Sequence, residues 1–345
     1  MSASVHDQNR AFIGRFRSAL YDVDTAELRG QLESLFAPDA EIQLAYPLGK
    51  MVGPDALLEK AYAPLLAAVP DLERRDYIVM AGPQDDESWV GCGGYYTGVF
   101  EQAWLDIPAT RHLVTMRYCE FFRVEGDQIV AMHGLWDIPE VMLQARAWPM
   151  SQSLGRELLI PGPATQDGIV TGPYDATRSA SSLALVSNML DGLGDYAAGR
   201  IEALEPGPYW HPKMNWYGPA GIGSNRRISG FRNWHQVPFR SGLPDTDSDM
   251  GKPYTQCYFG DGDYVAFCGF DAMHMTVAGD GWLGIAPPGK HIRMTSLDFW
   301  RCENGKIREN WVLVDLLDIY NKLGVDVFKR MREITVDRQL NPPPL

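Results

Sequence analysis

The feature that most constrains the fold is an internal repeat, because the second half of this 345-residue chain restates the first half with many substitutions. The segment WLDI at 104–107 recurs as WLGI at 282–285, an offset of 178 residues. At the same offset, EFFR at 120–123 falls on DFWR at 298–301. Self-similarity of this kind indicates two copies of one domain rather than a single large fold.

The repeat also sets the domain boundaries. Upstream, VPD at 69–71 matches LPD at 243–245 at an offset of 174, so the second half carries a net insertion of a few residues. Two domains of roughly 150 residues each agree with the usual domain size. The segment between the repeats is rich in Gly, Pro and Ser and has no hydrophobic period, which indicates a linker. The predicted division is a first domain at 1–149, a linker at 150–174, a second domain at 175–338 and a frayed tail at 339–345.

Each half predicts the same order of elements. Each opens with a helix, at Asn9–Leu35 and at Thr177–Ala203, and Asp175 or Thr177 is the expected N-cap of the later helix. Four strand-like runs close the second half, at Pro253–Phe259, Tyr264–Val277, His291–Arg301 and Lys306–Asp315, with hairpin-turn sequences at 260–263 and 303–306. Helices followed by antiparallel strands indicate the α+β class, with helices on one face of a curved antiparallel sheet that encloses a cone-shaped pocket.

The composition argues against several classes of partner. The chain has 31 basic and 44 acidic residues, a net charge of −13, whereas a nucleic-acid or anionic membrane surface needs a basic patch. No apolar run approaches the ~18 residues of a transmembrane helix, and the polar segment 1–8 lacks the apolar core of a signal peptide. The five cysteines form no CxxC pair, which favours reduced, buried thiols. We therefore expect a cytoplasmic protein without nucleic-acid or membrane partners.

The motifs of both halves resemble the SnoaL-like polyketide cyclases of the NTF2-like (ketosteroid-isomerase-like) superfamily. In the first half the resemblance rests on LFAPDAEI (35–42), AVPDL (68–72), YTGVF (96–100) and GDQIVAMHGLWD (126–137). In the second half it rests on YWHPKMNWYGPAGIG (209–223), GLPD (242–245), GKHIRMTSLDFWRCENGKIRENWVLVD (289–315) and NKLG (321–324). The resemblance implies two cone-shaped NTF2-like domains in tandem that form an internal pseudo-dimer, and it leaves a further homodimer open. Similar folds host isomerases, cyclases, epoxide hydrolases, dehydratases and non-catalytic binding modules, so the reaction is not fixed.

The last strand of each half carries candidate acid/base residues. Residues two apart in a strand share a face, which groups His133, Leu135 and Asp137 in the first half and Trp311, Leu313 and Asp315 in the second. The resemblance implies that this face lines the pocket and that Asp315, with Asp137 as its counterpart, is the acid/base residue. His133 stands where the family has a tryptophan. A desolvated carboxylate has a raised pKa, which suits a general base near neutral pH. The alternative is that each aspartate caps the following helix or pairs with an arginine.

Histidines and aromatic residues supply the candidate ligand contacts. His274 in HMT matches the histidine of an H-T-G motif found in many SnoaL-like proteins, with Tyr96 as its counterpart in the first half. In that role His274 would polarise a carbonyl or carry a proton. Further candidate contacts with a flat, hydrophobic substrate are Trp216, His211, His235, His291, Trp282, Trp311, Tyr96, Trp136 and Arg117. The alternatives are core packing for the aromatic residues, structural or surface positions for the histidines, and pairing of Arg117 with Glu120.

No sequence motif indicates a metal or another cofactor. Closely spaced His or Cys ligands, a phosphate-binding loop, a dinucleotide fingerprint and a nucleophile elbow are all absent from the sequence. The leading hypothesis is therefore a cofactor-independent acid/base enzyme of isomerase, cyclase or lyase type. Its substrate would be a small hydrophobic carbonyl compound, such as a polyketide-like or cyclic ketone, bound in the second half.

Two alternatives to this enzyme stay open. The first is a non-catalytic small-molecule-binding or scaffold protein of NTF2-like fold, which would have filled pockets. The second is a water-activating hydrolase of epoxide-hydrolase type, whose chemistry uses two aspartates and a central arginine. Thr295 and Ser296 stand where that arginine is expected, which disfavours the hydrolase.

Overall fold

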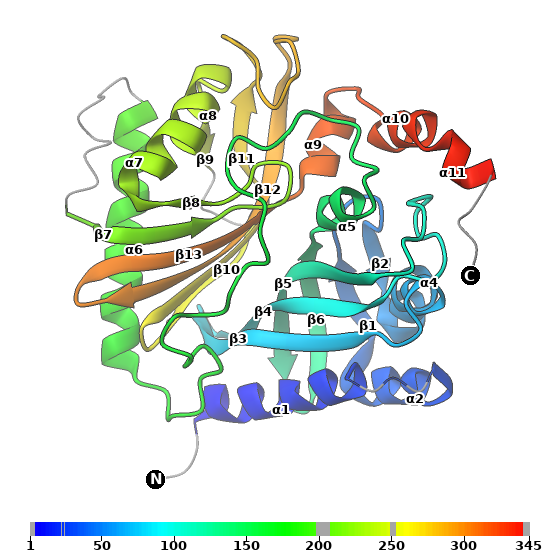
Figure 1. Cartoon of the computed structure of the whole chain (residues 1–345). Helices are drawn as coiled ribbons and strands as arrows, with labels where there is room; N and C mark the ends of the chain where they lie inside the picture. Colours follow the sequence, from blue (N-terminus) through cyan, green and yellow to red (C-terminus); the bar gives the residue numbers. More distant parts are fainter. Residues whose placement is uncertain (1–3, 22, 24, 198–207, 249–252, 341–345) are drawn as a thin grey trace.

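The protein consists of two α+β domains, one for each repeat, joined by an extended connection (Figure 1). The computed structural model describes residues 4–21, 23, 25–197, 208–248 and 253–340. The first domain contains α1 (Val5–Ala19), α2 (Thr25–Leu35), β1 (Phe36–Gln43), β2 (Lys50–Val52), α3 (Gly53–Leu57), the π-helical turn η1 (Leu58–Tyr62), α4 (Ala63–Ala68), β3 (Glu73–Gln84), β4 (Glu87–Val99), β5 (Leu113–Glu125), β6 (Gln128–Trp136) and α5 (Ile138–Gln144). The second contains α6 (Ala176–Ala197), β7 (Trp210–Tyr217), β8 (Asn225–Arg226), α7 (Arg227–Phe231), the π-helical turn η3 (Arg232–Gln236), α8 (Val237–Gly242), β9 (Asp247–Ser248), β10 (Thr255–Asp261), β11 (Tyr264–Thr276), β12 (His291–Glu303), β13 (Lys306–Val314), α9 (Leu316–Lys322), α10 (Val327–Ile334) and α11 (Val336–Leu340).

Each domain is built on one mixed sheet. The strand order is β2-β1-β6-β5-β4-β3 in the first domain and β10-β11-β12-β13-β7-β8 in the second, where β9 pairs with β11. Neighbouring strands are antiparallel, except that β1 runs parallel to β6 and β7 runs parallel to β13. The α+β class and the tandem arrangement of two domains are confirmed, but the expected antiparallel sheet is corrected to a mixed one. The parallel pair joins the first long strand of each half to the last, and no hairpin turn connects them to impose an antiparallel direction.

Local sequence signals account for several element boundaries. Asn304 and Gly305 both have positive φ, 51° and 70°, as the two-residue turn between β12 and β13 requires. Asp175 caps α6, because its Oδ1 accepts hydrogen bonds from two backbone N–H groups at the start of that helix, both at 3.0 Å. The single opening helix expected over Asn9–Leu35 is instead two helices, α1 and α2. Residues 198–203 of the second expected helix and 341–345 of the expected tail lie outside the described residues.

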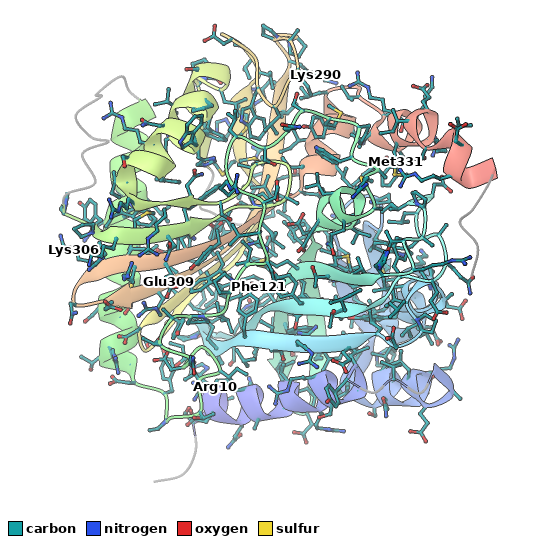
Figure 2. All side chains as sticks on the ribbon, viewed as in Figure 1. Arg10, Phe121, Lys290, Lys306, Glu309 and Met331 are labelled. Atoms are coloured by element: carbon teal, nitrogen blue, oxygen red, sulfur yellow. The ribbon has the colours of Figure 1, made fainter. Side chains whose placement is uncertain are left out.

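The two sheets face each other across an apolar layer. The Phe121 ring of β5 stacks on the Phe299 ring of β12, with centroids 5.2 Å apart and planes 6° apart, and Figure 2 labels Phe121 between the sheets. A Cβ atom at Gly91 would come within 2.8 Å of the Phe299 ring, so glycine allows this close approach. We call this set of buried residues the interdomain layer; it includes Trp89, Cys119, Phe121 and Leu135 of the first domain and Cys257, Phe299, Trp311 and Leu313 of the second.

Two aspartates at equivalent positions cross the boundary in opposite directions. Asp137 Oδ2 accepts a hydrogen bond from the Ala220 N–H at 2.9 Å, and Asp315 Oδ2 accepts one from the Tyr46 N–H at 2.8 Å. Asp315 follows Asp137 by 178 residues and Ala220 follows Tyr46 by 174, which are the two offsets of the repeat. The contacts are therefore copies of each other. This reciprocity agrees with the internal pseudo-dimer predicted from the sequence, which remains our interpretation of the arrangement.

The connection between the domains is anchored to both of them. Residues 145–175 contain no helix or strand. The Ile160 N–H donates to the Tyr95 hydroxyl of the first domain at 2.7 Å, and Trp311 Nε1 of the second domain donates to the Pro161 carbonyl at 2.9 Å. The connection is thus held by hydrogen bonds to both domains where it passes the interdomain layer.

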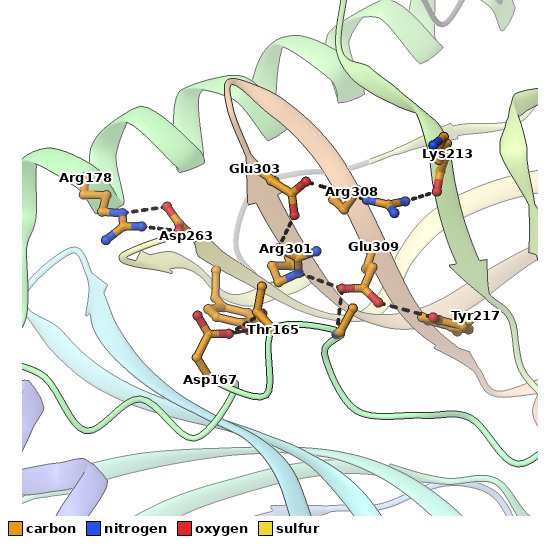
Figure 3. Close-up of polar contacts among 12 residues, drawn as sticks. Thr165, Asp167, Arg178, Lys213, Tyr217, Asp263, Arg301, Glu303, Arg308 and Glu309 are labelled. Carbon is orange, nitrogen blue, oxygen red and sulfur yellow. Dashed lines mark hydrogen bonds and ion pairs between the residues drawn. The ribbon is translucent and has the colours of Figure 1, made fainter.

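Further along, the connection meets a charged cluster on the second sheet, shown in Figure 3. Glu309 is buried and pairs with Arg301 at 2.6 Å. It also accepts a hydrogen bond from the Ala164 N–H at 3.2 Å. Nearby, Asp167 accepts a hydrogen bond from the Tyr264 hydroxyl at 2.6 Å. These bonds fix the course of the connection before it enters α6.

Both ends of the described chain also reach across to the other domain. Arg10 of α1 pairs with Asp261 of the second domain at 2.5 Å and donates to the Gly172 carbonyl at 2.7 Å. From the opposite end, Arg338 of α11 donates to the Arg146 carbonyl at 2.9 Å. The two domains are therefore held together by polar contacts at their edges as well as by the apolar layer.

All five cysteines are buried and none forms a disulfide. In the described part of the chain, no helix combines the length and the apolar character that crossing a bilayer requires.

Candidate functional site

The second domain encloses a cavity of about 240 Å³ between its sheet and the helices α6, α7 and α8. Its wall is mostly aromatic, with Trp210 and Trp216 of β7, Trp282, Trp300 of β12 and Phe267 of β11. Alternate residues of the two central strands also line it, namely Met294, Ser296, Asp298, Trp300, Asn310, Val312 and Val314. The residues between them point to the interdomain layer, because side chains alternate faces along a strand.

Asp298 is the buried carboxylate of this cavity, with 8% of its surface exposed. The Ser296 hydroxyl donates a hydrogen bond to Asp298 Oδ2 at 2.6 Å, and Asn310 Nδ2 lies 3.5 Å from Oδ1. No ion pair joins Asp298 to any residue that the structure describes. Burial raises the pKa of Asp298 to about 7, while the two hydrogen bonds act to lower it. The carboxyl group therefore exchanges protons near neutral pH, as a general base or acid must.

His235 belongs to η3 and faces the same cavity. Its ring stacks on Trp216, with centroids 4.0 Å apart and planes 22° apart, and lies 5.3 Å from Phe231 and 5.6 Å from Phe239. Within the described chain these ring contacts are its partners, and no hydrogen bond reaches it. Burial lowers the pKa of His235 to about 3, so the imidazole is neutral and can donate one hydrogen bond and accept another. The other polar residues of the lining are Gln236, Arg240, Thr246, Asp247, Ser296 and Asn310.

The structure corrects which face of β13 lines the cavity. The sequence predicts Trp311, Leu313 and Asp315 on the cavity side, and this is wrong, because Trp311 and Leu313 lie in the interdomain layer. Asp315 lies just beyond the strand, where it caps α9 by accepting a hydrogen bond from the Asp318 N–H at 3.2 Å. A displacement by one residue moves every side chain of a strand to the other face. Asp315 thus caps a helix, which was the alternative role considered for it, and it does not line the cavity.

The first domain shows the same displacement. His133 points away from the interior of its own domain, with its ring 5.8 Å from Trp89 and 5.6 Å from Phe270 of the second domain. Burial there lowers the pKa of His133 to about 4. Asp137 lies 3.7 Å from Arg117. Asp137 therefore pairs with an arginine, which was the alternative role considered for it.

His274 is displaced from the cavity by a bulge in β11. On β4, Tyr96 pairs with Met116 of β5, and the residue that pairs with the equivalent Met294 of β12 is Met273, not His274. The pairing register shifts in the segment just before Met273. Met273 is therefore the structural counterpart of Tyr96 and lines the cavity. His274 lies one residue further along and is not in the lining.

The remaining predicted contacts divide between the cavity and other positions. Trp216, His235 and Trp282 line the cavity. His211 and His291 do not line it. His211 Nδ1 accepts a hydrogen bond from the backbone two residues on, at 3.0 Å, and His291 is an exposed residue at the start of β12. The histidines thus do not form a group around one site.

The equivalent space in the first domain is filled by its own side chains. Glu120, the counterpart of Asp298 at an offset of 178, is fully buried. It accepts hydrogen bonds from Arg74 at 2.5 Å, from the Tyr96 hydroxyl at 3.0 Å and from Trp136 Nε1 at 2.8 Å. The cavity beside Tyr96 has a volume of about 10 Å³. Tyr96 and Trp136, both predicted as substrate contacts, therefore serve as internal packing.

At the position equivalent to Arg74, the second domain has an uncharged residue. Arg74 pairs with Tyr96 across β3 and β4, and Ser248 pairs with Met273 across β9 and β11. Ser248 thus holds the place of Arg74, at an offset of 174. A serine carries no charge, which explains why one carboxylate is locked in an ion pair and the other is not.

The buried carboxylate of the cavity, Asp298, is not among the candidate residues predicted from the sequence. A signal for it was present in the repeat, since EFFR at 120–123 and DFWR at 298–301 place an acidic residue at the same position of a buried strand in both halves. An acidic residue between apolar neighbours is rare inside a sheet unless it is paired or functional.

The buried Asp315 makes stability depend on pH. Burial raises its folded-state pKa to about 7, against ~3.9 in an unfolded chain. The folded protein therefore holds more protons than the unfolded one between these values, and the free energy of unfolding falls as pH rises through that window. Asp315→Asn removes this titration and keeps one hydrogen-bond acceptor. We expect its unfolding free energy to fall less steeply from about pH 4 to pH 7. Urea unfolding across this range measures it, and parallel curves for both proteins would contradict the expectation.

Comparisons with known proteins found one family match, to part of the second half of the chain. A family model described as SnoaL-like polyketide cyclase matches residues 204–323, which span β7 to β13 and α9. A search of curated proteins found no match. A putative SnoaL-like polyketide cyclase from Jannaschia sp. CCS1 has 18% identity over 41% of this chain and 94% of that chain, with a TM-score of 0.34. IdmH, a putative polyketide cyclase from Streptomyces antibioticus, has 20% identity over 40% of this chain and 97% of that chain, with a TM-score of 0.34.

The family match falls on the half of the chain that contains the cavity. It supports a function of cyclase or isomerase type for this protein. The second domain thus carries the match to the SnoaL-like polyketide cyclase family that its sequence motifs predicted.

Proposed function

We propose that this protein is an acid/base enzyme of isomerase, cyclase or lyase type, and that the cavity of the second domain is its active site. The observation that carries the proposal is Asp298, a buried carboxylate in an aromatic cavity with no ion pair to a described residue. Burial holds its pKa at about 7, so both protonation states are accessible under ordinary conditions. Asp298 takes the catalytic role that the sequence suggests for Asp315.

The chemistry is proton transfer next to a carbonyl. The Asp298 carboxylate takes a proton from the carbon beside the carbonyl, and the electrons of that C–H bond form an enolate. The neutral His235 ring donates a hydrogen bond to the enolate oxygen, which stabilises the developing charge. Where a C=C bond adjoins the enolate, return of the proton to the far carbon of the resulting dienolate gives isomerisation. Attack of the enolate carbon on a second carbonyl forms a C–C bond and closes a ring, and the proton goes to the new alkoxide.

The volume and the aromatic lining of the cavity favour a compact, flat substrate. Its volume of about 240 Å³ lies below the ~300–1,000 Å³ typical of drug-sized ligand pockets. Four tryptophans contribute to the wall, Trp210, Trp216, Trp282 and Trp300, and flat rings stack well on such surfaces. We therefore favour a hydrophobic ketone with one or two rings.

The proposal predicts α-proton exchange in a simple bicyclic ketone. With 2-tetralone in D₂O, the wild-type protein should speed the replacement of α-hydrogen by deuterium, followed by proton NMR. The rate should rise with pH around a midpoint of about 7, because the base is the ionised form of Asp298. The planar alcohol 2-naphthol, which resembles the enol of 2-tetralone, should bind and inhibit.

A matched control copies the filled interior of the first domain into the second. Val314 lines the cavity and is the counterpart of Trp136 at an offset of 178. Val314→Trp keeps Asp298 but removes the space for a ligand, so 2-naphthol binding and exchange should both be lost. Binding of 2-naphthol by the wild type without any exchange would contradict the enzyme and favour the binding-module alternative. Equal exchange by wild type and Val314→Trp would place the chemistry outside this cavity.

A further inference from the structure

Arg117 extends from the first domain to the backbone behind the second domain's cavity. It lies on β5 and has 1% of its surface exposed. One terminal nitrogen donates to the Tyr217 carbonyl at 3.2 Å, and the other donates to the carbonyls of Gly218 at 2.8 Å and Val312 at 2.9 Å. Gly218 follows β7 and Val312 belongs to β13. A single guanidinium group therefore joins two strands of the other domain.

These hydrogen bonds lie where the pairing of β7 with β13 ends. The parallel pairing of β7 with β13 ends at Tyr217 and Trp311, so the carbonyls just beyond that pair depend on another donor. Val312 is paired with Asp298 across β12 and β13. Trp216, which stacks on His235, immediately precedes Tyr217. The guanidinium thus holds the backbone directly behind the proposed catalytic groups.

This support runs in one direction only. The counterpart of Arg117 at an offset of 178 is Thr295. The Thr295 hydroxyl accepts a hydrogen bond from the Asp271 N–H of its own domain at 3.1 Å. Among the described residues, Thr295 makes no polar contact with the first domain. The filled domain therefore braces the domain that has the cavity, and within the described residues Thr295 supplies no equivalent brace in return.

We propose that Arg117 is a positioning residue for the reaction in the second domain, because it fixes the spacing of β7 and β13 and so sets Trp216 and Asn310 against His235 and Asp298. The role rests on the proposed function. Small displacements of reacting groups have large effects on rate, so a brace behind them acts on turnover more than on ligand binding. In this arrangement the first domain is a built-in support for the active site of the second.

The test compares Arg117→Met and Arg117→Lys with Arg10→Met. Arg10 is a matched control because it is also buried and also bonds across the domain boundary, but to Asp261 and Gly172, neither of which lines the cavity. For Arg117→Met we expect kcat for 2-tetralone exchange to fall roughly 10- to 100-fold, with a smaller loss of 2-naphthol affinity. Arg117→Lys should restore part of kcat, because an ammonium group can donate to one strand but cannot bridge both. Arg10→Met should lower stability and leave kcat unchanged.

Hydrogen–deuterium exchange of backbone amides separates this proposal from the proposed function. The amides of 210–217 and 306–314 should exchange faster in Arg117→Met than in Arg10→Met, whether or not the protein turns over 2-tetralone. Equal amide exchange and equal kcat in these two variants would overturn the positioning role. If Arg117→Met does not fold, Arg117→Lys decides, and wild-type kcat and amide exchange in that variant would overturn the role as well.

Discussion

An Asp298→Asn variant is expected to lose α-proton exchange of 2-tetralone by roughly 10²- to 10⁴-fold, the usual contribution of a general base, while still binding 2-naphthol. Asparagine has the shape of aspartate and can accept the hydrogen bond from Ser296, which lies 2.6 Å from the carboxylate. The amide cannot take a proton, so turnover is lost without loss of the cavity. NMR exchange rates and fluorescence titration with 2-naphthol measure the two effects separately.

The matched control for this variant is Asp315→Asn. Both aspartates are buried and both have a pKa raised to about 7 by burial, but Asp298 alone lines the cavity. Asp315→Asn should therefore retain exchange activity. The reverse result, with exchange lost in Asp315→Asn and kept in Asp298→Asn, would restore the residue that the strand pattern suggests and rule out the base proposed from the structure.

The largest loss of stability is expected for Arg74→Met in the first domain. Arg74 is fully buried, pairs with Glu120 at 2.5 Å and with Asp76 at 3.1 Å, and lies 4.2 Å from the centroid of the Tyr118 ring. Removing the cation leaves buried carboxylates without their compensating charge, which typically costs 3–5 kcal/mol of unfolding free energy, so we expect about that loss. Urea unfolding followed by tryptophan fluorescence measures it.

The double variant Arg74→Met with Glu120→Gln controls for the loss of packing. It removes one of the two uncompensated carboxylates together with the arginine and leaves Asp76, so it should recover part of the stability lost in the single variant. A double variant no more stable than Arg74→Met would show that the unpaired charge of Glu120 does not account for the loss.

The repeat allowed the fold to be predicted, because two matching halves leave few arrangements of helices and strands. The site was harder to predict, because β12 and β13 are buried on both faces. One face of each strand packs against the interdomain layer and the other lines the cavity, so apolar residues occupy both registers and alternation no longer marks the inner face. Trp311 and Val312 are equally reasonable cavity residues in the sequence, and the structure decides between them.

His274 illustrates a second limit of sequence reasoning. Its motif matches Tyr96 without gaps, but the bulge in β11 moves the structural match to Met273. A bulge inserts residues into a strand without leaving a reliable mark in a single sequence. The position of Arg117 could not be inferred either, because its partners lie about one hundred or more residues away in the other domain. Contacts of this kind depend on how the two domains pack.

Joining both halves in one polypeptide frees each half from having to be identical to the other. In a homodimer encoded by a single gene, an arginine introduced at the position of Arg74 enters both subunits and fills both interiors at once. Here Arg74 and Ser248 are separate codons, and so are Arg117 and Thr295. One half can therefore accumulate substitutions that make it rigid and closed while the other stays open. Duplication followed by fusion thus allows the two halves of one chain to differ, one with a filled interior and the other with a cavity.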